Sequence, residues 1–184
     1  MDRKTEIAVF GGGCFWCTEA VFGQLRGVLS VMPGFAGGTL ANPTYEQVCT
    51  GTTGHAEVTR VEYDPARISY RDLLVVFFAT HDPTSLNRQG ADVGTEYRSV
   101  VFHTTEEQKR MAQQMIEELN RAEPRGRPIV TEVSPLTAFY PAENYHRDYY
   151  RKNALAPYCQ VVIEPKLRKL HKQFGDLLKA HAEA

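Results

Sequence analysis

The chain has 184 residues, a length that fits one domain around a single hydrophobic core. Hydrophobic residues make up 42% and charged residues 23%, and the formal net charge of -1 gives no sign of nucleic-acid binding or of a disordered acidic tail. No apolar run approaches the roughly 20 residues that cross a bilayer, and residues 1–10 lack the apolar region of a signal peptide. We therefore expect a cytoplasmic protein with no membrane or nucleic-acid partner.

The first half of the chain predicts alternating strands and helices. Strands are expected at residues 7–10, 28–32 and 56–63, and helices at residues 14–24, at residues 42–51 and from residue 69. The alternation of apolar and polar residues over 56–63 is typical of a half-buried strand. Asn42-Pro43 can cap and begin a short helix, and Ser69 with Asp72 has the spacing of a capping box.

The second half continues the mixture. Strands are expected at residues 98–103, 129–133 and 160–163, and helices from residue 104 and over residues 165–181, where the last helix is amphipathic and its basic face is expected to be solvated. Residues 81–96 form a long, polar, irregular segment, and such segments inside compact domains tend to be functional or disordered. Residues 1–184 are therefore predicted to form one domain, an α/β or α+β two-layer sandwich.

The strongest local signal is Gly11-Gly-Gly-Cys-Phe-Trp-Cys-Thr-Glu-Ala20. The glycines allow close approach of backbone or ligand, and they bring Cys14 to the start of a helix. Unpaired N–H groups and the positive end of the helix dipole there favour a thiolate, so we predict a nucleophilic Cys14 with a lowered pKa. Phe15 and Trp16 are adjacent, so their side chains point in different directions from the helix start. We therefore do not expect both rings to lie in the core. One or both can form the wall of an apolar pocket over the sulfur.

Cys14 and Cys17 also form a Cys-x-x-Cys pair, which alone has three interpretations: a redox dithiol, half of a zinc site, or coincidence. Four cysteines are too few for a disulfide framework at this length. A zinc site needs further ligands, and Cys49 and Cys159 are both solitary. The rival functions are therefore a thioredoxin-like dithiol oxidoreductase and a zinc-stabilised interaction domain.

Several ordered motifs between about residues 7 and 163 resemble the peptide methionine sulfoxide reductase A family. They are Gly13-Cys-Phe-Trp16 with Glu19, Asn42–Gly51, Gly54-His-Ala-Glu57 followed by Val61–Pro65, His81–Thr84, Arg88–Gly90, Asp92–Ser99, Pro141–His146 and Asn153–Cys159. The resemblance implies a ferredoxin-like mixed sheet with helices on one face, plus extensions and a C-terminal helix. It implies reduction of the S epimer of methionine sulfoxide, free or in proteins, by a monomer that holds no metal or cofactor and is recycled by thioredoxin.

The resemblance also implies roles for individual residues. Cys14 is the nucleophile, Phe15 and Trp16 form the cage for the substrate methyl group, Glu57 protonates the sulfoxide oxygen, Tyr45 and Tyr97 place hydroxyls near that oxygen, and Asp92 supports the site. A sulfoxide is a poor electrophile until its oxygen is protonated, and a carboxylic acid kept neutral by an apolar site can supply that proton. Without the resemblance, Glu57 in its alternating strand would be interpreted as facing solvent.

The resolving cysteine is left open. Cys159 matches the first resolving cysteine of the family and is preferred to Cys17, which stands where the family commonly has glycine. Cys17 lies one helical turn from Cys14, so it could resolve the sulfenic acid itself or act in a relay with Cys159. The family's glycine-rich tail is replaced here by the basic helix that is predicted over residues 165–181.

Overall fold

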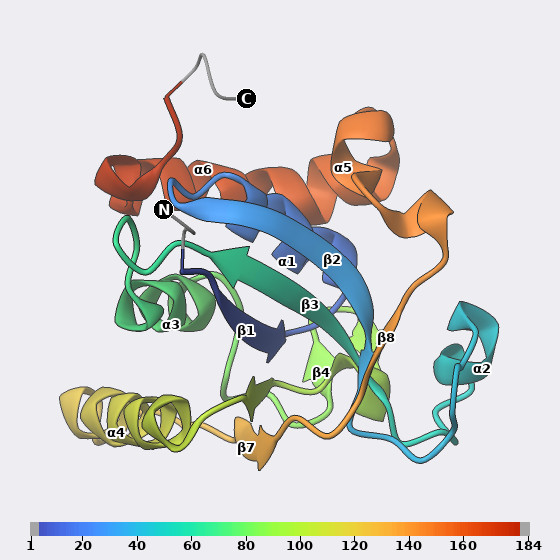
Figure 1. Ribbon diagram of the computed structural model, residues 1–184, viewed down its shortest axis with the longest axis horizontal. Coiled ribbons are helices and arrows are strands. Elements are labelled where there is room, and N and C mark those ends of the chain that lie inside the picture. The colour runs from blue at the N-terminus through green and yellow to red at the C-terminus, as the bar shows by residue number, and fades with distance from the viewer. Residues whose placement is uncertain (1–3, 181–184) are drawn as a thin grey trace.

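The computed structural model describes residues 4–180 and contains a mixed six-stranded sheet (Figure 1). The strands lie in the order β7 (Glu132–Pro135), β6 (Val100–His103), β1 (Glu6–Gly11), β3 (Ala56–Tyr63), β2 (Val28–Ala36) and β8 (Phe139–Pro141). Neighbouring strands are antiparallel, except that β6 and β7 are parallel. The two-residue strands β4 (Arg88–Gln89) and β5 (Asp92–Val93) form a separate hairpin. The structure therefore has a mixed α/β fold.

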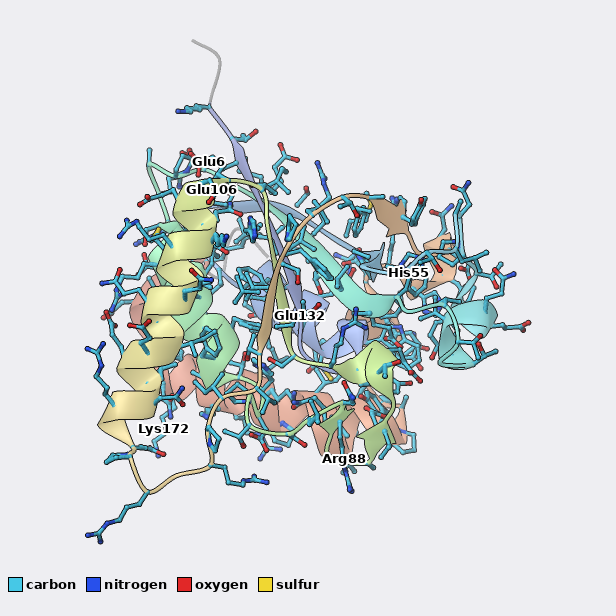
Figure 2. All side chains as sticks on the ribbon, turned by 90° about the horizontal axis from the view of Figure 1, so that it is seen from below. Glu6, His55, Arg88, Glu106, Glu132 and Lys172 are labelled. Atoms are coloured by element: carbon cyan, nitrogen blue, oxygen red, sulfur yellow. The ribbon has the colours of Figure 1, made fainter. Side chains whose placement is uncertain are left out.

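The helices are α1 (Phe15–Gly23), α2 (Tyr45–Cys49), α3 (Tyr70–Ala79), α4 (Glu106–Ala122), α5 (Tyr149–Lys152) and α6 (Glu164–Gln173). Helix α1 packs against β2, β3 and α6, and Figure 1 shows α1 and α6 behind these strands. Figure 2 shows α4 along the β7 edge, with Glu106 at one end of the helix. No helix within residues 4–180 is both long and apolar enough to cross a membrane.

The two faces of the sheet are buried unequally. On the helix side, Phe10 of β1 stacks between Phe22 of α1 and Phe77 of α3, with ring centroids 5.1 and 5.0 Å away. A smaller apolar cluster on the opposite face includes Val9 and Val58, against which Phe139 packs. Strand β3 lies between β1 and β2 and has apolar packing on both faces, so the expectation of a half-buried strand is wrong for its first half, where residues 56–59 are all buried.

Several sequence-based boundaries need correction. The short helix begins at Tyr45 with Thr44 as its cap, because Asn42 has a positive φ of 47°. Residues 160–163 belong to a π-helix, Cys159–Ile163, and not to a strand, because they lead directly into α6. Helix α6 ends at Gln173, followed by a 3-10 turn over Gly175–Leu177, and position 181 of the expected helix lies outside the described residues.

Other expectations are confirmed by the structure. The capping box of Ser69 and Asp72 is present at the start of α3. The expected strand at 56–63 has these bounds, and the strand expected at 7–10 occupies 6–11. The segment over 81–96 is largely irregular, and it carries the β4–β5 hairpin. Strand β8 has no counterpart among the predicted elements.

Candidate active site

The glycine-rich turn between β1 and α1 places Cys14 at the helix N-terminus. Gly13 has φ +90° and a Cβ there would lie 2.9 Å from the Gln89 side chain, so the turn requires glycine for both conformation and space. Cys14 is the N-cap residue of α1, in extended conformation, and its side chain is 6% exposed. The predicted position of Cys14 at the start of a helix is confirmed.

Glu57 lies beside this helix start as a buried acid. Its Oε1 accepts a hydrogen bond from the Phe15 backbone N–H at 3.2 Å, whereas its Oε2 is buried with no partner among the described residues. Burial raises the pKa of Glu57 to about 8, although the Phe15 N–H acts in the opposite direction. Glu57 is therefore mostly protonated at neutral pH, with one oxygen free to act on a ligand.

Cys14 and Cys17 are neighbouring buried thiols in the first turn of α1, where the Cys17 N–H donates to the Cys14 carbonyl at 3.0 Å. Burial raises the pKa of Cys14 well above its ordinary value, and the helix start lowers it only through the Trp16 N–H. The neighbouring Cys14 thiol, with smaller help from the charge of Lys166, lowers the pKa of Cys17 to about 7. The prediction of a lowered Cys14 pKa is therefore wrong for the free dithiol, because desolvation outweighs the helix dipole. The two thiols titrate as a pair, and a single negative charge is shared between them.

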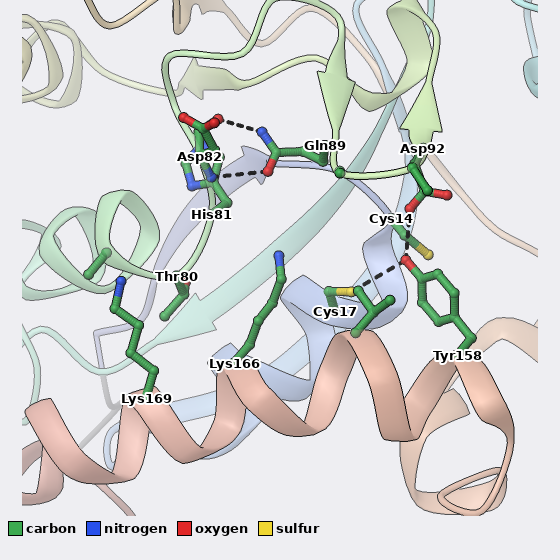
Figure 3. Close-up of a pocket in the computed structure, with 15 residues that line it drawn as sticks. Cys14, Cys17, Thr80, His81, Asp82, Gln89, Asp92, Tyr158, Lys166 and Lys169 are labelled. Carbon is green, nitrogen blue, oxygen red and sulfur yellow. Dashed lines mark hydrogen bonds between the residues drawn. The ribbon is translucent and has the colours of Figure 1, made fainter. Parts of the chain in front are cut away.

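A hydrogen-bond chain connects Cys17 to Asp92 through Tyr158 (Figure 3). The Tyr158 hydroxyl donates to Asp92 Oδ2 at 2.9 Å and lies 3.6 Å from the Cys17 sulfur. Asp92 is thus held at the site by the residue that also contacts Cys17. This role of Tyr158 was not foreseen from the sequence, although Tyr158 lies within the Asn153–Cys159 motif.

Aromatic rings form a wall beside the two thiols. The half-buried Trp16 ring stacks on Tyr149 at a centroid distance of 3.7 Å, and its Nε1 donates to His146 Nδ1 at 3.0 Å. The His146 ring lies 4.4 Å from that of Tyr45 and 5.1 Å from that of Phe15. Phe15 itself is fully buried and belongs to the core, so only Trp16 of the adjacent pair lies partly open.

Tyr45 and Tyr97 approach the acid from two different elements. Tyr45 begins α2 and Tyr97 ends the 3-10 turn Thr95–Tyr97, and both side chains are half-buried. Burial is the largest cause that raises the pKa of each hydroxyl, and the nearby Glu57 carboxyl raises both further. Both tyrosines therefore remain neutral hydrogen-bond donors at neutral pH.

Cys159 lies at the first residue of the π-helix and is 0% exposed. Its thiol pKa is raised by burial and, to a lesser degree, by Cys17. Cys159 packs in the main core cluster, which also includes Cys14 and Cys17, whereas Cys49 is exposed at the end of α2. Within residues 4–180, no group of three or more His, Cys, Asp or Glu side chains is arranged to hold a metal ion.

His146 was also missed by the sequence reasoning, although it lies in the quoted Pro141–His146 motif. It is fully buried, and its Nε2 makes no hydrogen bond among the described residues but lies 3.9 Å from Glu143 Oε2. Burial lowers the pKa of its ring, and the Glu143 carboxylate acts in the opposite direction. A neutral His146 therefore accepts from Trp16 through Nδ1 and keeps the indole in place. Only its place in this motif could have indicated a role for His146 from the sequence. A single histidine between regular elements has no local sequence pattern that indicates burial.

The family model for peptide methionine sulfoxide reductase matches residues 6–178. The chain belongs to this family. The peptide methionine sulfoxide reductase MsrA of Deinococcus radiodurans is 59% identical over 174 residues, which are 95% of this chain and 84% of that protein. The MsrA of Saccharolobus solfataricus is 53% identical over 176 residues, which are 96% of this chain and 98% of that protein.

Solved structures have the same fold. Methionine sulfoxide reductase A of Corynebacterium diphtheriae superposes with a TM-score of 0.78 at 38% identity, covering 84% of this chain and 78% of that chain. Reduced Mxr1 from Saccharomyces cerevisiae gives a TM-score of 0.77 at 33% identity, covering 85% and 90%. Mxr1 in complex with Trx2 gives a TM-score of 0.55 at 23% identity, covering 81% and 87%, a likeness of fold alone.

Proposed function

We propose that the protein reduces the S epimer of methionine sulfoxide, in proteins and as the free amino acid, to methionine. The observation that carries this proposal is a protonated, buried carboxyl beside a thiol at a helix start. Glu57 Oε2 has no partner and can donate its proton to the sulfoxide oxygen, which makes the sulfoxide sulfur electrophilic. Tyr45 and Tyr97 add neutral O–H donors toward the same oxygen, where negative charge develops.

The proposed nucleophile is Cys14. Because the two thiols share one negative charge, the Cys17 thiolate can accept the Cys14 proton as Cys14 attacks the sulfoxide sulfur. Glu57 transfers its proton to the sulfoxide oxygen, and the carboxyl later regains a proton from solvent. The attack forms a bond between the Cys14 sulfur and the substrate sulfur. The S–O bond of the substrate then breaks as the protonated oxygen bonds to the Cys14 sulfur, and cleavage of the bond between the two sulfurs releases methionine and leaves Cys14 as a sulfenic acid.

We assign the substrate methyl group to the aromatic wall. Trp16 offers a half-open indole face, and the buried Phe15 ring lies below it as part of the core. The stacking on Tyr149 and the hydrogen bond to His146 fix the indole, so little conformational entropy is lost when a methyl group binds there. Asp92, held by Tyr158, supports the opposite side of the proposed site.

We propose Cys17 as the first resolving thiol and Cys159 as the second, the reverse of the order preferred from sequence. Cys17 shares the first turn of α1 with Cys14, with its N–H donating to the Cys14 carbonyl at 3.0 Å, whereas Cys159 lies on a different element, at the start of the π-helix. Condensation of the Cys17 thiol with the Cys14 sulfenic acid gives a disulfide and water. A dithiol protein then reduces this disulfide, and thioredoxin is the proposed reductant, because Mxr1, 33% identical in its reduced form, has been solved with Trx2.

We also propose a ferredoxin-like core within a two-layer sandwich that forms one catalytic domain. The succession β1-α1-β2-β3-α3-β6 has the order of such a βαββαβ unit, and its strands lie as β6-β1-β3-β2. Strands β7 and β8 extend the two edges. The monomeric state, the lack of a resident cofactor and the cytoplasmic location remain parts of the same proposal.

Single-turnover assays test the function directly. Reduced protein without added reductant is mixed with each methionine sulfoxide epimer, and methionine and remaining thiols are counted. We expect wild type to release about one methionine per chain from the S epimer only, with loss of two thiols. Cys14→Ser should release none, because no sulfur remains to accept the oxygen.

Two further variants complete this test. Cys17→Ser should still release methionine, more slowly, and should accumulate a Cys14 sulfenic acid that dimedone traps. Cys49→Ser is the matched control, since Cys49 is exposed on α2, and it should behave as wild type. Methionine release by Cys14→Ser at the wild-type rate would refute the proposed function.

A further inference from the structure

The dithiol also lines a cavity that lies among the end of α3, the β4–β5 hairpin and α6. The cavity has a volume of about 480 Å³, and both Cys14 and Cys17 line it together with Asp92, Tyr158 and the ends of α3 and α6. Among the described residues, its lining includes neither Glu57 nor the rings of Phe15, Trp16, Tyr45 and Tyr97. Cavities of this size hold small molecules and exclude a folded protein domain.

Two lysines of α6 give the cavity its charge. Figure 3 shows both side chains extending from α6 into the cavity, with Lys169 on the side of Thr80 and Lys166 closer to Cys17. Neither lysine has an acidic partner within 4.0 Å among residues 4–180. The basic face of α6, which the sequence analysis expected to be solvated, therefore contributes charge to the cavity.

The other ionisable groups of the cavity are already engaged. Asp82 accepts from the Thr84 side chain and backbone and pairs with Arg127 at 3.4 Å, and Asp92 accepts from Tyr158. His81 is neutral at physiological pH, because burial lowers its pKa to about 4. Both carboxylates of the cavity therefore have a partner, whereas Lys166 and Lys169 have no acidic partner, so we take the two lysines as the groups that receive a charged ligand, which would be an anion.

We propose that this cavity binds a small thiol that carries a carboxylate or sulfonate group, and that this thiol reduces the Cys14–Cys17 disulfide directly. The proposal rests on the proposed function, because it needs that disulfide as the product of sulfoxide reduction. Lys166 and Lys169 bind the anionic group, and the thiol sulfur reaches the two cysteines at the inner end of the cavity. The reductant would thus approach the dithiol from the side of α6, whereas Glu57 and the rings assigned to the sulfoxide do not line this cavity.

The reduction proceeds by two thiol–disulfide exchanges. The small thiolate attacks the Cys14 sulfur, which is 6% exposed against 2% for Cys17, and Cys17 leaves as a thiolate near Lys166 and Tyr158. A second small thiolate attacks the bound thiol's sulfur, and Cys14 leaves. Two small thiols become one disulfide, two cysteines are reduced, and the protons of the small thiols restore the cysteine thiols.

The test compares three small thiols as reductants in steady-state turnover with saturating methionine sulfoxide. They are 2-mercaptoethanesulfonate, neutral 2-mercaptoethanol and cationic cysteamine, matched in thiolate concentration and ionic strength. We expect half-saturation by the sulfonate at a concentration roughly fivefold below that of 2-mercaptoethanol, and weaker action of cysteamine. Lys169→Gln should reduce this preference, and the double variant Lys166→Gln/Lys169→Gln should abolish it.

Lys172→Gln is the matched control, because Lys172 lies on α6, is exposed and does not line the cavity. It should keep the wild-type order of thiols. Equal use of the three thiols by wild type would overturn the cavity proposal, as would lysine variants that weaken binding of free methionine sulfoxide instead of the anionic thiol. Absence of methionine release by wild type in the single-turnover assay would instead refute the proposed function, so the two failures are distinguishable.

Discussion

Glu57 is a polar residue whose surroundings change its chemistry. In the sequence it occupies a polar position of an alternating strand, where an ordinary glutamate faces solvent. In the structure it is 1% exposed and receives the first N–H of α1. Only the Gly54–Glu57 motif indicated a role, because the apolar side chains that bury Glu57 come from distant segments that periodicity cannot place.

The protonation of Glu57 predicts how the reaction depends on pH. The acid must be protonated to donate, so the single-turnover rate should fall as pH rises through about 8. It should also fall below about pH 7, where the Cys14–Cys17 pair keeps both of its protons. Glu57→Gln keeps a hydrogen-bond donor but has no proton to transfer, so it should lower the single-turnover rate by about 10²-fold or more. The fall in rate as pH rises through about 8 should also disappear in this variant. Rapid-quench measurements from pH 6 to 10 check both points.

The same substitution has an effect on stability with a definite sign. The pKa of Glu57 is raised in the folded state, so the folded protein holds a proton that the unfolded chain loses between about pH 4.5 and 8. The free energy of unfolding of wild type should therefore decline relative to Glu57→Gln as pH rises through this range. A wild-type rate for Glu57→Gln, or a constant stability difference, would contradict this account.

At the scale of elements, local sequence signals were reliable where one or two side chains decide the structure. The Ser69 hydroxyl accepts from the Asp72 N–H at 3.0 Å and the Asp72 carboxylate accepts from the Ser69 N–H at 3.3 Å. Glycines end β1 at the predicted place. The π-helix over Cys159–Ile163 was not predictable, because Val161, Val162 and Ile163 have strand propensity and only their continuity with α6 overrides it.

The cap of α3 gives a stability prediction. Ser69→Ala removes the acceptor for the Asp72 N–H and should lower the free energy of unfolding by about 1 kcal/mol. Urea denaturation measures the change through the transition midpoint. Ser69→Thr is the matched control, since threonine keeps an acceptor oxygen, and it should lose clearly less. Equal losses for both variants would show that the hydroxyl does not act as a cap.

At the scale of the whole molecule, the candidate site is assembled from segments that are far apart in the sequence. Cys14 follows β1, Glu57 begins β3, Tyr97 precedes β6 and Tyr158 precedes the π-helix. The family motifs predicted most of this set, because each motif is a short run of residues. They did not predict the lysine-lined cavity, because that depends on how α6 packs beside the hairpin.

The places of the cysteines in the fold predict which disulfide forms first. Cys14 and Cys17 share the first turn of α1, whereas Cys159 begins the π-helix. We expect Cys159→Ala to lose two thiols per methionine released, through a Cys14–Cys17 disulfide formed at the wild-type rate. Peptide mapping of the oxidised variant checks this pairing. Accumulation of the Cys14 sulfenic acid in Cys159→Ala, with Cys17 still free, would restore Cys159 as the first resolving residue.

The chain contains one tryptophan, Trp16, and the fold places it in the aromatic wall beside the dithiol. Its indole contacts His146 and Tyr149 and lies edge-on to Tyr158, the residue that contacts Cys17. The tryptophan fluorescence of the protein therefore comes from the candidate active site alone. Substrate arrival and the redox state of the thiols can be followed optically in the unlabelled protein.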